Sequence, residues 1–275
     1  MAQENSGATQ DAPKETADMA PSGSGAAESR PIDVVSLYAH DMNIYGDSGN
    51  VLTIEKRLRL YGYEPVVHLY NPGDPWPQHV DLVLGGGGQD SGQRTIQEDF
   101  LQHDEILRRL AKQGVPMLMI CGLYQLFGKY FQTVSGDRIP GIGVFDAVTI
   151  GKKARLIGNV VECSRDFGII VGYENHSGQT FLHGDTKPLA TVSKGKGNNL
   201  DDSFEGARVG NVIGTYMHGS LLPKNPRIAD FLIARAAEHR YSLFEPRMSQ
   251  EGCHELDLLD RTAREARDVA QQRPR

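Results

Sequence analysis

From Pro31 onward, short continuous apolar runs alternate with segments whose apolar residues are spaced as in helices. The runs at 32–38, 64–70 and 115–120 are typical of buried strands, and 50–62 reads as an amphipathic helix that ends at Gly62. A further short strand breaks into four glycines at 85–88, and a second helical pattern covers about 93–112. This alternation predicts an α/β fold with a doubly wound, mostly parallel sheet flanked by helices, in which sites lie at the carboxyl ends of strands.

The second half of the chain has a different pattern, with strand-like segments and little helix between them. This predicts an antiparallel extension of the sheet, built from 142–150, 155–163, 168–175, 188–195 and 207–219. A helix is expected at 226–240. The charged tail over 246–275 has helical spacing at a few leucines, which favours a solvated or partner-binding helix over core.

The first thirty residues carry almost no large apolar side chains, so we interpret 1–30 as a disordered leader and 31–245 as one catalytic-size domain. Neither a secretory signal nor an 18-residue apolar run occurs, so we expect a cytoplasmic protein without a membrane span. The net charge of −6, without a basic cluster, disfavours nucleic acid as a partner. Three widely spaced cysteines lack zinc-ligand spacing, so neither a metal nor a disulfide scaffold is expected.

Cys121 stands where an apolar strand stops and a helical pattern begins. A side chain on such a turn is exposed above the sheet, and the N-terminus of the following helix favours the thiolate over the thiol. Cys121 is therefore a candidate nucleophile. The alternative is a buried cysteine that acts as a small hydrophobic residue.

The glycines at 85–88 and His218 supply what such a nucleophile needs. Attack on a carbonyl requires N–H donors for the oxyanion, and we expect them at Gly87 and Gly122. A flexible loop or a phosphate-binding turn is the alternative, although the phosphate-binding glycine motifs are missing. His218 closes the strong strand in "GTYMHGS" and precedes a glycine, which makes it the candidate general base among nine histidines.

Taken together, these segments resemble class I glutamine amidotransferases, which have a Cys-Gly-x-x-Gln nucleophile segment. More narrowly, the chain resembles the GatD family, the glutaminase subunits of lipid II isoglutaminyl synthase, a branch related to cobyric acid synthase. The motifs that carry this resemblance span Ile32 to about His239 and are "NIYGDSGN", "GGGQDS", "ICGLYQLFG", "RLIGN", "YENHSG", "GKGNN" and "GTYMHGSLLPKNP". The implied fold is the flavodoxin-like one of class I amidotransferases.

The resemblance implies a role for each matching residue. Cys121 would attack the side-chain carboxamide of L-glutamine to give a γ-glutamyl thioester and ammonia, with His218 first as base and then as acid. Gln125 and Arg155 would hold the glutamine, the arginine by pairing with its α-carboxylate. For Arg155 the alternative is an exposed strand cation.

Two positions depart from the family pattern. Many related glutaminases have His-x-Glu at the end of the histidine strand, where the acid orients the imidazole, but here that position is Ser220. We therefore hypothesise that an acid of a partner subunit completes the triad; Glu174 is a second candidate within the chain. Leu123 replaces a glycine usual in the family and is expected to add bulk beside the nucleophile.

The resemblance also implies a Mur-ligase-like, MurT-type partner. That subunit would use ATP and Mg²⁺ to activate the α-carboxyl of D-glutamate in the lipid II stem peptide, so no cofactor is expected on this chain. Two alternatives remain: the glutaminase of a cobyrinate-type amidotransferase, and a non-catalytic module that only binds its partner.

Overall fold

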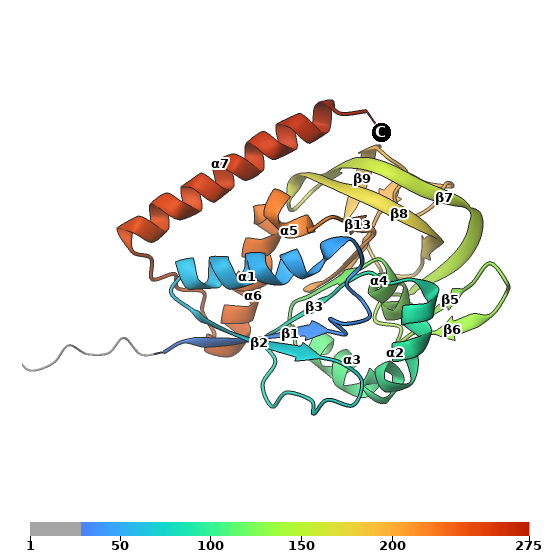
Figure 1. Cartoon of the computed structure of the whole chain (residues 1–275), viewed down its shortest axis with the longest axis horizontal. Coiled ribbons are helices and arrows are strands. Elements are labelled where there is room, and N and C mark those ends of the chain that lie inside the picture. Colours follow the sequence, from blue (N-terminus) through green and yellow to red (C-terminus); the bar gives the residue numbers. More distant parts are fainter. Residues whose placement is uncertain (1–28, 275) are drawn as a thin grey trace, which may run out of the picture.

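The computed structural model describes residues 29–274, so most of the predicted leader lies outside the described residues. Two β-sheets lie side by side, with helices covering the first (Figure 1). Five strands of the first sheet are parallel in the order β12-β4-β3-β1-β2, and β11 adds an antiparallel edge. Their bounds are β1 Pro31–Leu37, β2 Glu64–Tyr70, β3 Leu82–Gly85, β4 Met117–Ile120, β11 Ala207–Val209 and β12 Val212–Thr215. The α/β class and the doubly wound sheet are confirmed.

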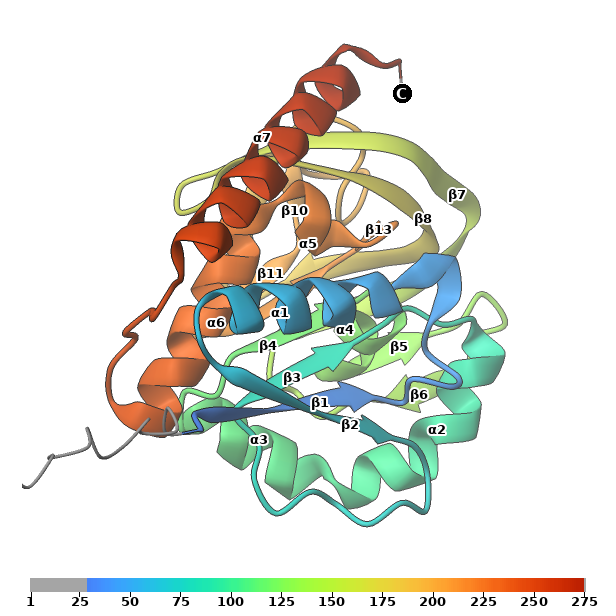
Figure 2. The same cartoon turned by 60° about the vertical axis from the view of Figure 1, so that its left-hand side comes forward.

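Helices cover both faces of this sheet. On one side lie α1 (Ser48–Leu60) and α6 (Pro226–Tyr241), and on the other α2 (Asp90–Gln102) and α3 (Asp104–Lys112) (Figure 2). The single helix predicted at 93–112 is instead two, because His103 leaves helical geometry at φ −96° and ψ 7°. Its ring there stacks on Trp76.

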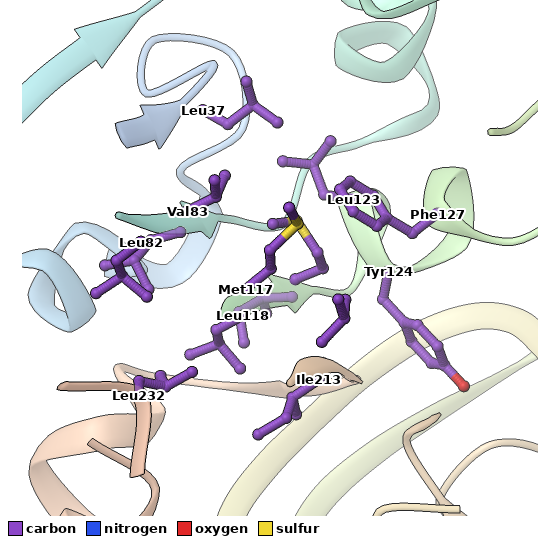
Figure 3. Close-up of a cluster of buried hydrophobic side chains, with 14 of the residues drawn as sticks. Leu37, Leu82, Val83, Met117, Leu118, Leu123, Tyr124, Phe127, Ile213 and Leu232 are labelled. Atoms are coloured by element: carbon purple, nitrogen blue, oxygen red, sulfur yellow. The ribbon is translucent and has the colours of Figure 1, made fainter. Parts of the chain in front are cut away.

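The main core lies between the first sheet and its helices. Val83 and Met117, which are paired on neighbouring strands, lie on the side of Leu123 and Phe127 of α4 (Gly122–Phe127), whereas Leu82, one position before Val83, points to the opposite face (Figure 3). All five of these side chains are buried. The near-continuous apolar strands follow from burial on both faces, which parallel sheets require.

The antiparallel strands of the second half form mainly a second sheet, so the predicted extension of the first is wrong except for β11. The long strands β7 and β8 pair with each other as a hairpin. β5 and β9 pair with β7, and β13 pairs with β8. The members are β5 Tyr130–Gln132, β6 Arg138–Pro140, β7 Ala147–Ser164, β8 Gly168–Leu182, β9 Ala190–Lys194, β10 Phe204–Glu205 and β13 Met217–His218.

The chain passes from one sheet to the other at Tyr216. The buried Glu205 carboxylate accepts hydrogen bonds from the Tyr216 amide at 2.7 Å and from the Thr215 hydroxyl at 2.9 Å, where a strand partner would otherwise be needed. β12 therefore ends on the first sheet and β13 begins on the second, with His218 paired opposite Tyr173. This crossing brings the end of β13 against the first sheet.

The charged tail forms the helix α7 (Gln250–Gln272), which packs across α1 and the short α5 (Leu221–Lys224) (Figure 1). Gly252 and Ala263 are its buried residues, while Leu258 and Leu259 are exposed. Across residues 29–274, none of the helices has the length and apolarity to cross a membrane.

Candidate active site

Cys121 occupies a sharp turn between β4 and α4. Its backbone has φ 48° and ψ −98°, a left-handed conformation that costs a non-glycine residue on the order of 1–3 kcal/mol. The Cys121 amide donates to the Thr215 carbonyl at 2.8 Å, which ties the turn to the end of β12. The strained strand-to-helix turn is the geometry that presents a nucleophile above a sheet.

Gly87 marks the point where Cys121 and His218 meet. A Cβ added to this glycine would lie 2.5 Å from Cε1 of His218 and 3.1 Å from Cβ of Cys121. His218 is fully buried, and Cys121 is 7% exposed. The structure thus brings together the predicted nucleophile, the predicted base and the predicted glycine turn.

A carboxylate of the chain itself faces the base. Oδ2 of Asp47 lies 3.5 Å from Nδ1 of His218 and accepts a 2.7 Å hydrogen bond from the Gly87 amide. The chain therefore supplies a candidate acid, Asp47, that the sequence did not identify. The carboxylate of Glu174, the candidate named from the sequence, accepts hydrogen bonds from the amides of Lys196 and Gly197.

The charges around His218 favour its protonated form. Burial lowers the pKa of the imidazole, but the negative charge of Cys121 and the Asp47 carboxylate oppose this and raise the pKa to about 10. The surroundings of the ring therefore favour an imidazolium when the Cys121 sulfur carries a negative charge. A thiolate paired with an imidazolium is the reactive form of a cysteine nucleophile.

The predicted oxyanion donor at Gly87 needs a correction by one residue. Its amide is already bonded to Asp47, whereas Gly88 lines the cavity in front of Cys121. A Cβ on Gly122 would lie 3.0 Å from the Gly88 nitrogen, so the Gly88 and Gly122 backbones converge. Gly87 therefore binds the Asp47 carboxylate, and Gly88 faces the cavity.

The two departures from the family pattern have structural explanations. Ser220 donates a 2.8 Å hydrogen bond to the Gly46 carbonyl, so it holds the loop that carries Asp47. Leu123 is fully buried in the core and does not line the cavity, which corrects the expectation of bulk beside the nucleophile (Figure 3).

A cavity of about 330 Å³ opens in front of Cys121 and His218. Its far wall comes from β7 and β8, whose register shifts between Gly151 and Leu156. Such a bulge re-aims side chains, and Arg155 at its end lines the cavity and donates from Nε to Oδ1 of Asn175 at 2.6 Å. The predicted cation thus reaches the site despite lying on an otherwise exposed strand segment.

Gln125 also lines the cavity, on the buried side of α4. Its amide is held within the protein, because Oε1 accepts from Nε2 of Gln93 at 2.7 Å and Nε2 donates to the Tyr216 hydroxyl at 3.2 Å. Each of these two atoms can make one further hydrogen bond, so the Gln125 amide can bind a substrate while it keeps both contacts.

Three residues of the site were not predicted: Asp47, Tyr45 and Asp90. Asp47 and Tyr45 lie in "NIYGDSGN", where the acid directly before a helix was a usable signal. Asp90 is the one carboxylate among the described residues that line the cavity, and Arg155 is the one guanidinium. One fixed charge of each sign suits a zwitterionic amino acid.

Comparison with known proteins agrees with this geometry. Residues 33–226 match the family of CobB/CobQ-like glutamine amidotransferase domains. The chain is 36% identical to the "Lipid II isoglutaminyl synthase (glutamine-hydrolyzing) subunit GatD" of Staphylococcus aureus, over 78% of this chain and 88% of that protein. It is 35% identical to the subunit of the same name from Streptococcus pneumoniae, over 80% of this chain and 88% of that one.

More distant similarities point the same way. A probable cobyric acid synthase of Methanothermobacter thermautotrophicus is 38% identical over 58% of this chain but only 34% of that protein. Two solved glutamine amidotransferases share the fold. One is 15% identical with a TM-score of 0.52 and covers 74% of this chain and 98% of its own. The other, from Thermotoga maritima, is 14% identical with a TM-score of 0.50 and covers 87% and 93%. The chain belongs to the family of CobB/CobQ-like glutamine amidotransferase domains.

Proposed function

We propose that this chain is the glutaminase subunit of a two-chain lipid II isoglutaminyl synthase. The observation that carries the proposal is the buried His218–Asp47 pair beside Cys121, at the end of a cavity with one guanidinium and one carboxylate. Relatives named as subunits of that enzyme, which match most of this chain, support the choice of reaction. The substrate of this half-reaction is L-glutamine.

In the first step the Cys121 thiolate attacks the side-chain carboxamide carbon of glutamine. The carbonyl oxygen takes the negative charge and is stabilised by the amides of Gly88 and Gly122. The His218 imidazolium gives its proton to the leaving nitrogen, so that the C–N bond breaks, ammonia departs and a γ-glutamyl thioester forms.

In the second step His218, now neutral, takes a proton from water. The resulting hydroxide attacks the thioester and releases glutamate and the thiolate. Asp47 keeps Nδ1 of the imidazole oriented and stabilises the positive charge that returns to the ring. The Gly87 amide in turn fixes the Asp47 carboxylate.

Recognition of the amino-acid end falls to the two charged residues that line the cavity. Arg155 would pair with the α-carboxylate and Asp90 with the α-ammonium group, while Gln125 lines the inner part of the cavity. A substrate that lacks either charge would leave one of these side chains without its partner.

The ammonia would pass to a Mur-ligase-like partner that binds ATP and Mg²⁺ and amidates the α-carboxyl of D-glutamate in lipid II. The word "subunit" in the names of the relatives supports a partner, and the type of partner rests on the sequence resemblance. We place both proteins at the cytoplasmic face of the membrane, where lipid II is made.

The test is amidation of lipid II by the reconstituted complex with either glutamine or ammonium as the nitrogen source. Cys121→Ala is expected to abolish glutamine-dependent amidation and to leave ammonium-dependent amidation intact. Cys163→Ala, at an exposed free cysteine, is the matched control and should change neither. A Cys121→Ala complex that still uses glutamine would make the chain a non-catalytic binding module.

A further inference from the structure

The loop over residues 43–47, here called the lid loop, contacts the catalytic wall at several points. The Ile44 amide donates to the Gly87 carbonyl at 3.0 Å, and the Gly46 carbonyl accepts from Ser220. At its end Asp47 faces His218. The five residues of the lid loop thus contact Gly87, His218 and Ser220.

Tyr45 at the centre of the lid loop has features of a functional residue rather than a core residue. Its backbone is left-handed, with φ 60° and ψ 20°, and its side chain is 45% exposed. Its ring meets the His218 imidazole edge to face, with centroids 4.9 Å apart. Backbone strain at an exposed aromatic residue that covers a catalytic side chain is a reason to look for a role at the site.

The Tyr45 hydroxyl connects the lid loop to the opposite wall of the cavity. It accepts a 2.6 Å hydrogen bond from Nδ2 of Asn175, whose Oδ1 accepts from Nε of Arg155 at 2.6 Å. All three side chains line the cavity. Because Arg155 uses only Nε here, its two terminal nitrogens keep their donors for a carboxylate.

We propose that residues 43–47 are a lid over the glutamine site and that Tyr45 is a positioning residue, which couples the carboxylate at Arg155 to the alignment of His218. The coupling rests on the proposed function. Hydrogen bonds between exposed side chains add little net stability, so the Tyr45–Asn175 contact can open for entry of the substrate. A carboxylate bound by Arg155 would order Asn175, then Tyr45, and through the tyrosine ring the imidazole.

The experiment compares two reagents that alkylate Cys121 in the full chain. The diazo-ketone analogue of glutamine carries the α-amino and α-carboxylate groups, whereas iodoacetamide carries neither and reports only thiolate reactivity. Tyr45→Phe keeps the ring and loses the hydroxyl, so labelling by the analogue should slow about 2- to 10-fold while the iodoacetamide rate is unchanged. Tyr45→Ala should slow both reactions, because the ring that packs against the His218 imidazole is then missing.

Tyr173→Ala is the matched control, since this residue pairs opposite His218 and is 39% exposed but does not line the cavity. Its rates should equal those of the wild type. Asn175→Ala should reproduce Tyr45→Phe, and the double variant should be no slower than either single one, because both changes break the same chain of contacts. Thermal midpoints verify that each variant folds.

Two results would overturn the positioning role: wild-type labelling rates in Tyr45→Ala, or an equal loss in Tyr173→Ala. Failure of the glutaminase function is a separate result. In that case the analogue would not label the wild type at all, while iodoacetamide would still show whether Tyr45 holds the Cys121–His218 pair.

Discussion

The two walls of the active-site cavity differ in how they are built. The wall from the first sheet and β13 carries Cys121, His218 and Asp47, all at most 7% exposed, and its nucleophile has a strained backbone. The wall from β7 and β8 carries Arg155 and Asn175, which are at least partly exposed and lie beside a bulge. In the proposed function, the chemistry thus occupies a buried region and recognition of the substrate a more exposed one.

This difference has a physical reason. Charges that develop during bond breaking are stabilised best by groups that are already fixed and shielded from water. Groups that bind the charged end of a free amino acid must instead be reached from solvent and release the product afterwards. Substitutions in the first wall should therefore reduce kcat, whereas substitutions in the second should mainly raise KM.

Asp47→Asn is expected to have the largest effect on glutamine hydrolysis. An amide still accepts the Gly87 hydrogen bond but does not stabilise the imidazolium, so kcat should fall about 10²- to 10⁴-fold. Asp41→Asn, a few residues earlier and outside the cavity lining, is the control. An unchanged kcat in Asp47→Asn would mean that the acid of the triad comes from another source, such as a partner subunit.

Gly87→Ala should follow, with a loss of kcat of about 10²-fold, because a displacement of reacting groups by about 1 Å has an effect of this size. The new Cβ would lie 2.5 Å from the His218 ring and push it away from Cys121. Gly136→Ala is the contrasting variant. That glycine has φ +97° and nothing within 4 Å of its Cβ position, so the change should lower the thermal midpoint and leave kcat unaltered. Equal kcat values in the two variants would contradict the close contact.

Arg155→Ala in the second wall should raise KM about 10- to 100-fold with a smaller change in kcat, as expected for loss of hydrogen bonds from a charged group. Asp90→Asn should also raise KM if it meets the α-ammonium group. Lys153→Ala, an exposed cation two residues from Arg155, should behave as the wild type. Steady-state ammonia release separates the cases, and a pure kcat loss in Arg155→Ala would argue against substrate binding there.

The smallest expected effect is a shift in the pKa of His218, followed by NMR of the imidazole. Burial lowers this pKa, and the charge of Cys121 contributes the largest opposing effect, ahead of Asp47. With a pKa of about 10 in the wild type, His218 should stay protonated above neutral pH as long as the Cys121 sulfur is charged. Cys121→Ala should lower the pKa more than Asp47→Asn does. The reverse order would mean that the thiolate is not the main partner of the ring.

The sequence alone predicted the elements that depend on a local pattern of residues. Apolar runs placed β1, β2 and β4 correctly, and the strand-Cys-Gly-helix pattern located the nucleophile turn. The separation into two sheets was not predictable, because it depends on the Glu205 side chain, which replaces a strand partner at Tyr216. Asp47 was missed because it is 171 positions from His218 and only the fold of the first loop brings them together. Ser220 stands where an acid is usual and instead holds the loop that supplies one.

The most direct test of a site completed within one chain is intact-mass analysis of the isolated protein after exposure to the diazo-ketone analogue of glutamine. We predict a single adduct that maps to Cys121 without any partner present, and a much slower adduct in Asp47→Asn. Labelling of the wild type only after addition of the synthetase subunit would contradict the role of Asp47 and show that the working acid comes from that subunit.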